Sequence, residues 1–299
     1  MNYAVIDLGS NTVRLCVYQY INETIKTIIN QKETVGLASY VSDGILQQEG
    51  INRACEVLTE FGMVIDQFDE ISAHVIATAS LRNINNSDEA VEFIQQKTGM
   101  TIHVLSGENE ALFDFFGASH QLSCENGLLI DIGGASTELV LFNHDGPQIL
   151  TSMPIGSLNL YGRFVKGFFP DSHERKEIKK EVICHLDSVE AKTDGAPIMI
   201  GVGGTLKAAY KLACALYDIS PECKEMASDD IKNLYKRFKE PDKTLIHTVY
   251  KTVPERALTI VPGLILLRQA IKHFGCTTIR ISEYGVREGY LLKRVIGAK

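Results

Sequence analysis

The stretch that decides the fold is residues 128–141, LLIDIGGASTELVL. An apolar run rich in branched residues ends at Asp131, is interrupted by small and polar residues, and resumes as a second apolar run after Glu138. Two such runs separated by a glycine-containing break predict a strand, a tight turn and a second strand. Asp131 and Glu138 lie on opposite arms of this hairpin, so we expect both side chains to end near the turn.

The turn itself is suited to bind an anion. Glycines allow backbone N–H groups to face outward at close range, and neighbouring hydroxyl groups add further donors. A concave group of this kind holds anions, most often phosphate. The two carboxylates beside it are suited to a divalent cation or to orienting a water molecule. A single hairpin of this composition is still more simply explained as an ordinary turn, because Asp, Gly and Ser are common turn residues.

The same pattern occurs a second time, at residues 4–15, AVIDLGSNTVRL. Aligning Asp7 with Asp131 also aligns Gly9 with Gly133. Two copies in register, far apart in the chain, are harder to explain as unrelated turns. They predict two related lobes, each offering a phosphate-binding hairpin to a shared cleft.

Composition restricts the class of protein. The chain has 299 residues, 45% of them hydrophobic and 22% charged, which allows a sizeable core and favours two domains. Its seven cysteines contain no Cys-x-x-Cys pair, and its eight histidines contain no His-Glu-x-x-His spacing. A disulfide framework and a histidine-based metal site are therefore disfavoured, and we expect reduced thiols in a cytoplasmic protein.

Charge and hydropathy restrict the partners. A net charge of −7 argues against general nucleic-acid binding, and it requires local basic patches for any polyanionic substrate. Basic runs on predicted helices at 172–189 and after Ser228 are most simply solvated faces, although a long polyanion has room to lie along the first. The most apolar segment, 257–267, is broken by Pro262 and is too short to span a membrane. The first predicted strand follows Met1 directly and leaves no room for a signal peptide.

Three further features are candidates for a site. Residues 197–206, PIMIGVGGTL, predict a strand followed by a glycine turn that opens a helix, an arrangement that favours phosphate binding or close packing of a flat ligand. Arg82 follows a predicted strand and either binds phosphate in a cleft or makes a surface salt bridge. Glu108 and Glu110 lie in the first turn of a predicted helix, where they complement the helix dipole. Composition alone assigns no further role to these two carboxylates.

Six segments, in this order along the chain, resemble motifs of the Ppx/GppA family of exopolyphosphatases and guanosine pentaphosphate phosphohydrolases. They are 7–12 (DLGSNT), 77–82 (ATASLR), 106–111 (SGENEA), 131–138 (DIGGASTE), 201–205 (GVGGT) and 283–289 (EYGVREG). The resemblance implies an α/β fold of the two-lobed actin-like, ribonuclease-H-like ATPase type, with a phosphate-binding cleft between the lobes. With the boundary in the polar turn at 124–127, we expect residues 1–124 and 284–299 in the N-terminal lobe and 125–283 in the C-terminal lobe. The chain resembles the short form of the family, without the C-terminal helical domain of longer members.

The resemblance also implies roles for the matched residues. Glu110 is implied to polarise the water that attacks the terminal phosphoryl group, and Arg82 to neutralise charge. Asp131 and Glu138 are implied to hold Mg²⁺ and the water, with Asp7 as a further metal partner. The residues expected to bind phosphate are Gly9, Ser10, Asn11, Thr12, Gly133, Gly134, Ala135, Ser136, Gly203, Gly204 and Thr205.

Two positions depart from the family pattern. Ala135 stands where a third glycine is common, and Asn109 stands where the family commonly has a first glutamate before Glu110. A methyl group at a turn is tolerated if its φ is negative, but it narrows the anion site. One carboxylate in place of two near the water leads us to expect reduced turnover.

The leading hypothesis is a bacterial-type, magnesium-dependent hydrolase that releases terminal phosphate from inorganic polyphosphate. A homodimer is one expected assembly, and neither nucleic acid nor a membrane is expected as a partner. Moving a phosphoryl group to water needs an aligned nucleophile together with a metal and N–H donors that absorb charge, and these residues supply them. Three alternatives remain: a guanosine pentaphosphate 5′-phosphohydrolase, an ATP-dependent small-molecule kinase, and a sensor that binds polyphosphate or an alarmone without turnover.

Overall fold

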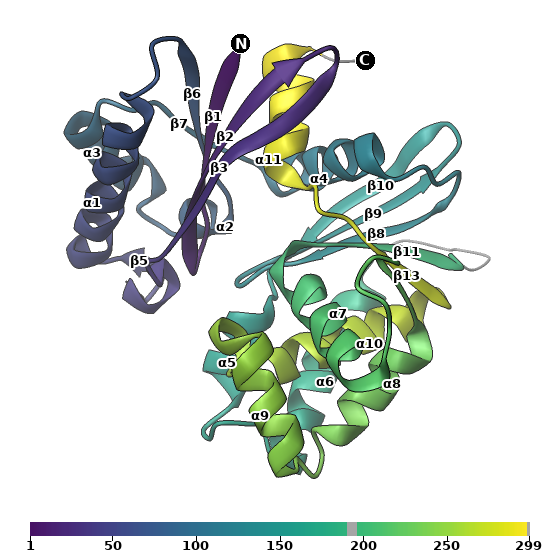
Figure 1. Cartoon of the computed structure of the whole chain (residues 1–299). Helices are drawn as coiled ribbons and strands as arrows, with labels where there is room; N and C mark the ends of the chain where they lie inside the picture. The colour runs from purple at the N-terminus through teal and green to yellow at the C-terminus, as the bar shows by residue number, and fades with distance from the viewer. Residues whose placement is uncertain (190–195, 298–299) are drawn as a thin grey trace. The chain divides into compact units, whose positions relative to one another are not determined.

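The computed structural model describes residues 1–189 and 196–297 (Figure 1). The chain folds into two compact units. Unit 1 consists of Met1–Glu110 and the segment from Tyr290 onward, and unit 2 consists of Ala111–Gly289. Each unit has its own sheet and its own hydrophobic core, so each is described by itself.

Unit 1 is built on a five-stranded sheet with the strand order β3-β2-β1-β6-β7. The first three strands form an antiparallel meander, and β6 and β7 continue the sheet parallel to β1. The elements of this part of the chain are β1 (Asn2–Leu8), β2 (Thr12–Ile21), β3 (Thr24–Thr34), η1 (Leu37–Tyr40), β4 (Val41–Ser42), β5 (Ile45–Leu46), α1 (Gln48–Ile65), β6 (Ile71–Ala77), α2 (Ala79–Arg82), α3 (Ser87–Thr98) and β7 (Ile102–Val104).

The core of unit 1 lies between the sheet and helices α1 and α3, which cover one side of it (Figure 1). The 3.6-residue spacing of Ile51, Ala54, Leu58 and Phe61 predicts one buried face of α1, and all four side chains are buried in this core. The inward residues of β1 alternate along the strand, as expected when one face of a sheet is packed.

Unit 2 contains a six-stranded sheet with the order β10-β9-β8-β11-β13-β12. Residues Leu128, Ile130 and Ile132 of β8 pack against α6, α7 and α10, while Leu129 packs on the opposite face against α4 (Figure 1). The elements of this part of the chain are α4 (Gly107–Gln121), β8 (Gly127–Ile132), β9 (Thr137–Asn143), β10 (Gly146–Met153), α5 (Ser157–Phe164), α6 (Ser172–Asp187), β11 (Ile198–Val202), α7 (Gly203–Tyr217), β12 (Glu225–Ala227), α8 (Ser228–Arg237), α9 (Lys243–Thr252), η2 (Pro254–Arg256), α10 (Ile260–Phe274), β13 (Thr278–Ile281) and α11 (Val286–Gly289). The π-helical η3 (Tyr290–Ile296) follows α11 and belongs to unit 1.

The two sheets share one topology. In each, three antiparallel strands are followed by two strands parallel to the first, in the orders β3-β2-β1-β6-β7 and β10-β9-β8-β11-β13. This is the ribonuclease-H-like arrangement, of which actin-like ATPases contain two copies. The predicted α/β fold class is therefore confirmed.

The limits of the units differ from the expected ones. The boundary falls between Glu110 and Ala111 and not in the turn at 124–127. The physical reason is that α4 packs on the unit 2 sheet, where Ala111 and Ala118 share a core with Leu129. The chain returns to unit 1 at Tyr290, whose ring lies against His74, and not at residue 284.

Pro262 does not break a helix as its position in the sequence suggested. The irregular segment lies earlier, at η2, and α10 begins at Ile260 with Pro262 in its first turn. Proline is tolerated there because the first N–H groups of a helix have no partner within the helix.

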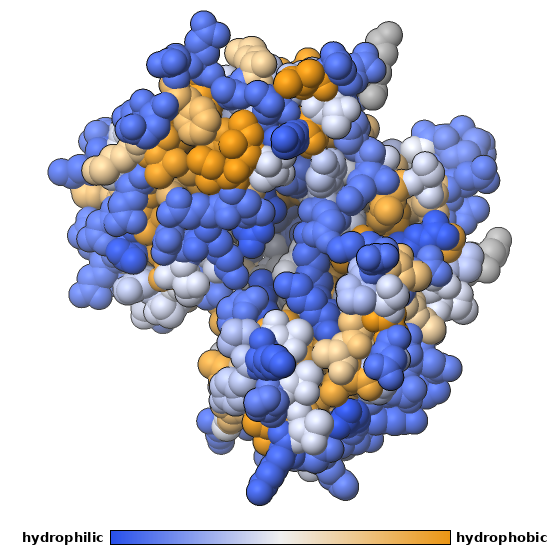
Figure 2. Space-filling model, in the orientation of Figure 1, coloured by the Kyte–Doolittle hydropathy of each residue, from blue (hydrophilic) through white to orange (hydrophobic). Residues whose placement is uncertain are grey.

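The surface and the cysteines agree with an ordinary globular chain. Most of the face seen in Figure 2 is hydrophilic, with apolar residues in scattered groups. Among the residues that the structure describes, no helix combines the length and the hydropathy needed to cross a membrane. All seven cysteines carry free thiols.

Gly289 allows α11 to pack directly on the backbone of α4. A Cβ atom at Gly289 would overlap the carbonyl oxygen of Phe113 and lie 2.9 Å from the Gly117 nitrogen. We expect Gly289→Ala to lower the free energy of unfolding by about 1–3 kcal/mol, measured by chemical denaturation, because overpacking forces the two backbones apart.

The matched control is Gly162→Ala in α5, where an added Cβ meets no atom within 4 Å. Alanine is the better helix former, so this variant should gain about 0.5–1 kcal/mol. Equal stability of Gly289→Ala and the parent would show that the two helices are not in backbone contact.

Candidate active site

The two glycine hairpins have the same backbone geometry. The Gly9 N–H donates to the carbonyl of Thr12 at 3.1 Å, and the Gly133 N–H donates to the carbonyl of Ser136 at 3.0 Å. The strands pair so that Asp7 faces Arg14 and Asp131 faces Glu138. The alignment of the two sequence repeats is therefore an alignment of two structurally equivalent turns.

The start of α5 donates hydrogen bonds to the carbonyl oxygens of the unit 2 hairpin. The carbonyl of Gly133 accepts from the Ser157 N–H, that of Gly134 accepts from the Leu158 N–H, and that of Ala135 accepts from the side-chain amide of Asn159, each at 2.9 Å. In a trans peptide the C=O and the following N–H point in opposite directions. The N–H groups of residues 134–136 therefore point away from α5, as an anion site requires.

The carbonyl oxygens of the unit 1 hairpin are also hydrogen-bonded by a neighbouring segment. The carbonyl of Ser10 accepts from the Ala38 N–H at 2.9 Å, and that of Asn11 accepts from the N–H groups of Val35 and Gly36 at 3.0 and 2.8 Å. These contacts come from the segment around η1, which has no relation in sequence to α5. The N–H groups of residues 11 and 12 consequently point away from that segment.

The residue opposite the aspartate distinguishes the two hairpins. Asp7 is directly opposite Arg14 on β2, an arrangement of opposite charges. Asp131 is directly opposite Glu138 on β9, so two carboxylates share one face of the sheet. Like charges directly opposite each other are destabilising, and a cation shared between them relieves the repulsion. Sequence reasoning assigned no role to Arg14, although the repeat already aligned it with Glu138.

Glu138 is fixed in place by its neighbours. It is 1% exposed, and its Oε1 accepts from the Ser152 hydroxyl of β10 at 2.7 Å. The carboxylate of Asp131 lies against Gly203, where an added Cβ would overlap it. Gly203 has φ +80°, a conformation that favours glycine. The third glycine turn thus meets the hairpin, and Gly203 makes room for a carboxylate.

The other two residues of the third turn have different surroundings. Gly204 lies against the guanidinium of Arg256, because an added Cβ would overlap that group. Sequence reasoning missed Arg256, which comes from η2, far along the chain. Thr205 was expected to bind phosphate, but it is 1% exposed and its hydroxyl donates to Ser157 Oγ at 3.4 Å. Its direct role is to connect α7 with α5.

The 283–289 motif is joined to α7 by Lys207. Its Nζ donates to the backbone carbonyl of Glu283 at 3.0 Å and lies 3.4 Å from that residue's carboxylate. Burial lowers the pKa of Lys207, and the nearby Glu283 carboxylate opposes that shift. The motif therefore packs beside the first turns of α7.

Arg82 and Glu110, predicted separately, form an ion pair in unit 1. Arg82 Nη1 lies 2.6 Å from Glu110 Oε2, and the same nitrogen donates to the Leu105 carbonyl at 3.0 Å. Both side chains are largely buried, so this is not the surface salt bridge that composition favoured for Arg82. The short helix α2, which carries Arg82, is tied to the end of β1 by a hydrogen bond from Ser80 Oγ to the Leu8 carbonyl.

Glu110 and its neighbours on α4 have different exposures. Glu110 is 8% exposed, whereas Glu108 and Asn109 are exposed to solvent. The residue that follows Glu110, Ala111, packs with Leu129 of β8. The departure at Asn109 therefore falls on an exposed position of α4. The departure at Ala135 is also tolerated, since this residue is absent from those with positive φ.

The donor set for a metal is made of carboxylates alone. No group of three or more His, Cys, Asp or Glu side chains is close enough to hold a metal in residues 1–189 and 196–297. Mg²⁺ is commonly bound by one or two carboxylates together with waters and substrate phosphates. The facing pair of Asp131 and Glu138 fits this requirement, whereas Asp7 belongs to the other unit.

Comparison with known proteins identifies relatives of nearly the same length. Residues 16–296 match the Ppx/GppA phosphatase family. The crystal structure of the Aquifex aeolicus family member is 26% identical, covers 99% of this chain and 98% of its own, and has a TM-score of 0.82. An exopolyphosphatase from Cytophaga hutchinsonii is 22% identical, covers 100% and 99%, and has a TM-score of 0.87, which shows a common fold.

The opposite partners of Asp7 and Asp131 predict opposite effects of the same substitution. Asp7→Asn should lower the free energy of unfolding by about 0.5 kcal/mol, because it removes attraction to Arg14. Asp131→Asn should raise it by about 0.5 kcal/mol, because it removes repulsion from Glu138. Chemical denaturation in a metal-free buffer measures both. A change of the same sign in the two variants would contradict this electrostatic difference.

Proposed function

The chain belongs to the Ppx/GppA phosphatase family, and from this premise we propose that it is a hydrolase that releases terminal orthophosphate from inorganic polyphosphate by magnesium-assisted attack of water. Membership in a family of phosphohydrolases supports phosphatase activity on polyphosphate or guanosine polyphosphates. The choice of polyphosphate and the assignment of residues are our proposals.

The observation that carries the mechanism is the buried Glu110 carboxylate beside Arg82. Attack on a phosphoryl group needs a base that orients and accepts a proton from water. The Arg82 guanidinium fixes the position of the carboxylate and supplies positive charge where a phosphoryl group would gain negative charge. We assign Glu110 as the base that acts on the water and Arg82 as a phosphate-neutralising residue.

Each unit also carries a glycine turn suited to phosphate, and unit 2 carries the facing carboxylates. The outward N–H groups of residues 11–12 and 134–136 would bind non-bridging phosphoryl oxygens, and they need no rearrangement as charge develops. Asp131 and Glu138 would hold Mg²⁺, which supplies charge neutralisation for the phosphates when it is bound.

A second candidate substrate, guanosine pentaphosphate, is favoured by one observation. The Nη2 end of the Arg256 guanidinium lies against Gly204 at the start of α7. Arginine is a common donor to the O6 and N7 acceptors of guanine, so Arg256 is a candidate contact for a guanine base. Competition of guanosine pentaphosphate with long-chain polyphosphate in one assay separates the two substrates.

A cytoplasmic location is also part of the proposal. All seven cysteines are free thiols, and Cys16 and Cys276 are buried. Free thiols persist in compartments kept reduced by glutathione and thioredoxin.

Replacing the proposed base should strongly reduce turnover without unfolding the protein. We expect Glu110→Gln to reduce orthophosphate release from long-chain polyphosphate by about 10²–10⁴-fold, the usual contribution of general base catalysis. The matched control is Glu108→Gln, an exposed carboxylate two residues earlier on α4, which should keep the parent rate. Parent activity no higher than that of Glu110→Gln would refute the hydrolase. Tight binding without release under any metal would instead identify a sensor.

Magnesium should stabilise the parent through the carboxylate pair. At a concentration about ten times its Kd, Mg²⁺ should raise the free energy of unfolding by about 1.4 kcal/mol, and Asp131→Asn should lose most of this gain. Asp145→Asn, at an exposed aspartate in the turn between β9 and β10, is the control and should respond like the parent. Thermal denaturation with and without Mg²⁺ provides the readout. An equal response of Asp131→Asn and the parent would place the metal elsewhere.

A further inference from the structure

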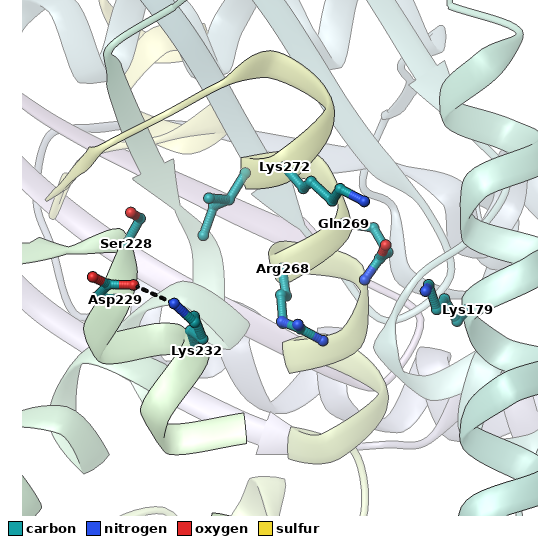
Figure 3. Close-up of a pocket in the computed structure, with 8 residues that line it drawn as sticks. Lys179, Ser228, Asp229, Lys232, Arg268, Gln269 and Lys272 are labelled. Atoms are coloured by element: carbon teal, nitrogen blue, oxygen red, sulfur yellow. Dashed lines mark hydrogen bonds and ion pairs between the residues drawn. The ribbon is translucent and has the colours of Figure 1, made fainter. Parts of the chain in front are cut away.

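A pocket lies among helices α6, α8 and α10 of unit 2 (Figure 3). Helix α10 packs against both of the other helices, and the space between them has a volume of about 260 Å³. The pocket shares no residue with the candidate active site. The residues that line it are Lys179, Ser228, Asp229, Lys232, Arg268, Gln269, Ile271 and Lys272.

The pocket concentrates positive charge in a chain of net negative charge. Four of its side chains are cationic and only Asp229 is acidic, whereas the whole chain has a net charge of −7. Asp229 is already bound by Lys232 at 3.0 Å. Lys179, Arg268 and Lys272 have no carboxylate within ion-pair distance among the residues that the structure describes. The local field therefore favours an anion.

Two side chains on α10 are placed to contact such an anion. Gln269 is 6% exposed as a whole residue and lines the pocket, and its side-chain amide makes no hydrogen bond in residues 1–189 and 196–297. Its amide therefore faces the pocket, where a ligand oxygen would accept from it. The guanidinium of Arg268 lies over the Tyr235 ring at 5.0 Å, which fixes its position while its N–H edges remain available for a ligand.

The alternative is a solvated basic face, which the sequence favoured for both α6 and α8. On a solvated face the lysines of a run are expected to project independently into water. Here one lysine from each run, Lys179 and Lys232, reaches the same pocket as Lys272 of α10 (Figure 3). By contrast Lys180, next to Lys179, pairs with Glu177 at 2.7 Å. The convergence of three helices on one hollow is not a property of any single helix face.

We propose that this pocket binds a phosphate-rich anion, of the size of inorganic tripolyphosphate or of the phosphates of a nucleoside triphosphate. The guanidinium binds two oxygens of one phosphate, the lysines act as point charges, and the Gln269 amide donates to a further oxygen. Several cations around one small space match a multivalent anion better than a single carboxylate. The proposal goes beyond the proposed hydrolysis and does not require it.

Lysine footprinting tests occupancy of the pocket directly. The full-length protein in metal-free buffer is acetylated under limiting conditions with and without inorganic tripolyphosphate, and the modification of each lysine is quantified by mass spectrometry. Lys179, Lys232 and Lys272 should react at least about threefold more slowly with the anion present, because bound phosphate covers their ammonium groups. Lys176 and Lys236, on the same helices but outside the pocket, are the internal references and should be unchanged.

Parallel samples with a nucleoside triphosphate distinguish the source of the phosphates. Protection by tripolyphosphate alone identifies an inorganic ligand, and protection by the nucleotide alone identifies a nucleotide site; either result supports the pocket. No protection by either anion, or equal protection of the reference lysines, overturns the proposal. Because no turnover is measured and Mg²⁺ is absent, failure of the proposed hydrolase would leave this result unaffected.

Matched double variants provide an independent test by calorimetry in the Glu110→Gln background. Lys179→Gln/Lys232→Gln should weaken tripolyphosphate binding at the pocket by about tenfold, whereas Lys176→Gln/Lys236→Gln, with the same change in net charge on the same helices, should not. Gln269→Leu, which keeps the volume, should also weaken binding. Equal affinity and stoichiometry of the two double variants would contradict a specific site.

Discussion

The register between β8 and β9 is the constraint on which the candidate site of unit 2 depends. Because side chains alternate between the faces of a strand, a shift of one residue would turn Asp131 and Glu138 to different faces. The observed register keeps them opposite each other, with Glu138 bound to Ser152 on the next strand. Burial of Leu128, Ile130 and Ile132 on the opposite face holds this register, so core packing determines the position of the two carboxylates.

The ability of the turns to bind phosphate depends on hydrogen bonds that the carbonyl oxygens of the same peptide groups accept. In both hairpins the carbonyl oxygens are occupied by donors from a following segment, which is α5 in unit 2 and the region around η1 in unit 1. Each occupied carbonyl directs the next N–H the opposite way. Two segments with unrelated sequences thus direct the N–H groups of both turns outward. The sequence repeat is therefore limited to the glycine hairpin and does not extend to the segments that bind its carbonyl oxygens. Gly156 serves this arrangement, since an added Cβ would lie 2.6 Å from the carbonyl oxygen of Gly134.

The charged residues differ between the two units, and they also differ between the two anion sites proposed for unit 2. The equivalent positions opposite the two aspartates carry Arg14 in one hairpin and Glu138 in the other, so a metal is expected only beside the second. The candidate active site combines carboxylates with backbone donors, which suits a phosphate that arrives with Mg²⁺. The pocket among α6, α8 and α10 combines cationic side chains with an amide, which suits a phosphate without a metal.

The sequence by itself determined the α/β class, the two hairpins and the placement of Asp131 and Glu138 on opposite arms of one hairpin, because alternation and glycine breaks are local patterns that hydrogen bonding along neighbouring strands must follow. It also indicated the buried face of α1 from its spacing. Only the tertiary structure decided that Arg82 pairs with Glu110, that Arg256 covers Gly204, and that α4 packs on the unit 2 sheet from Ala111 onward. These contacts join segments far apart in the chain, and their formation depends on how helices pack on a sheet, which no local pattern encodes. The same reason explains why two basic runs that look like solvated faces contribute to one pocket.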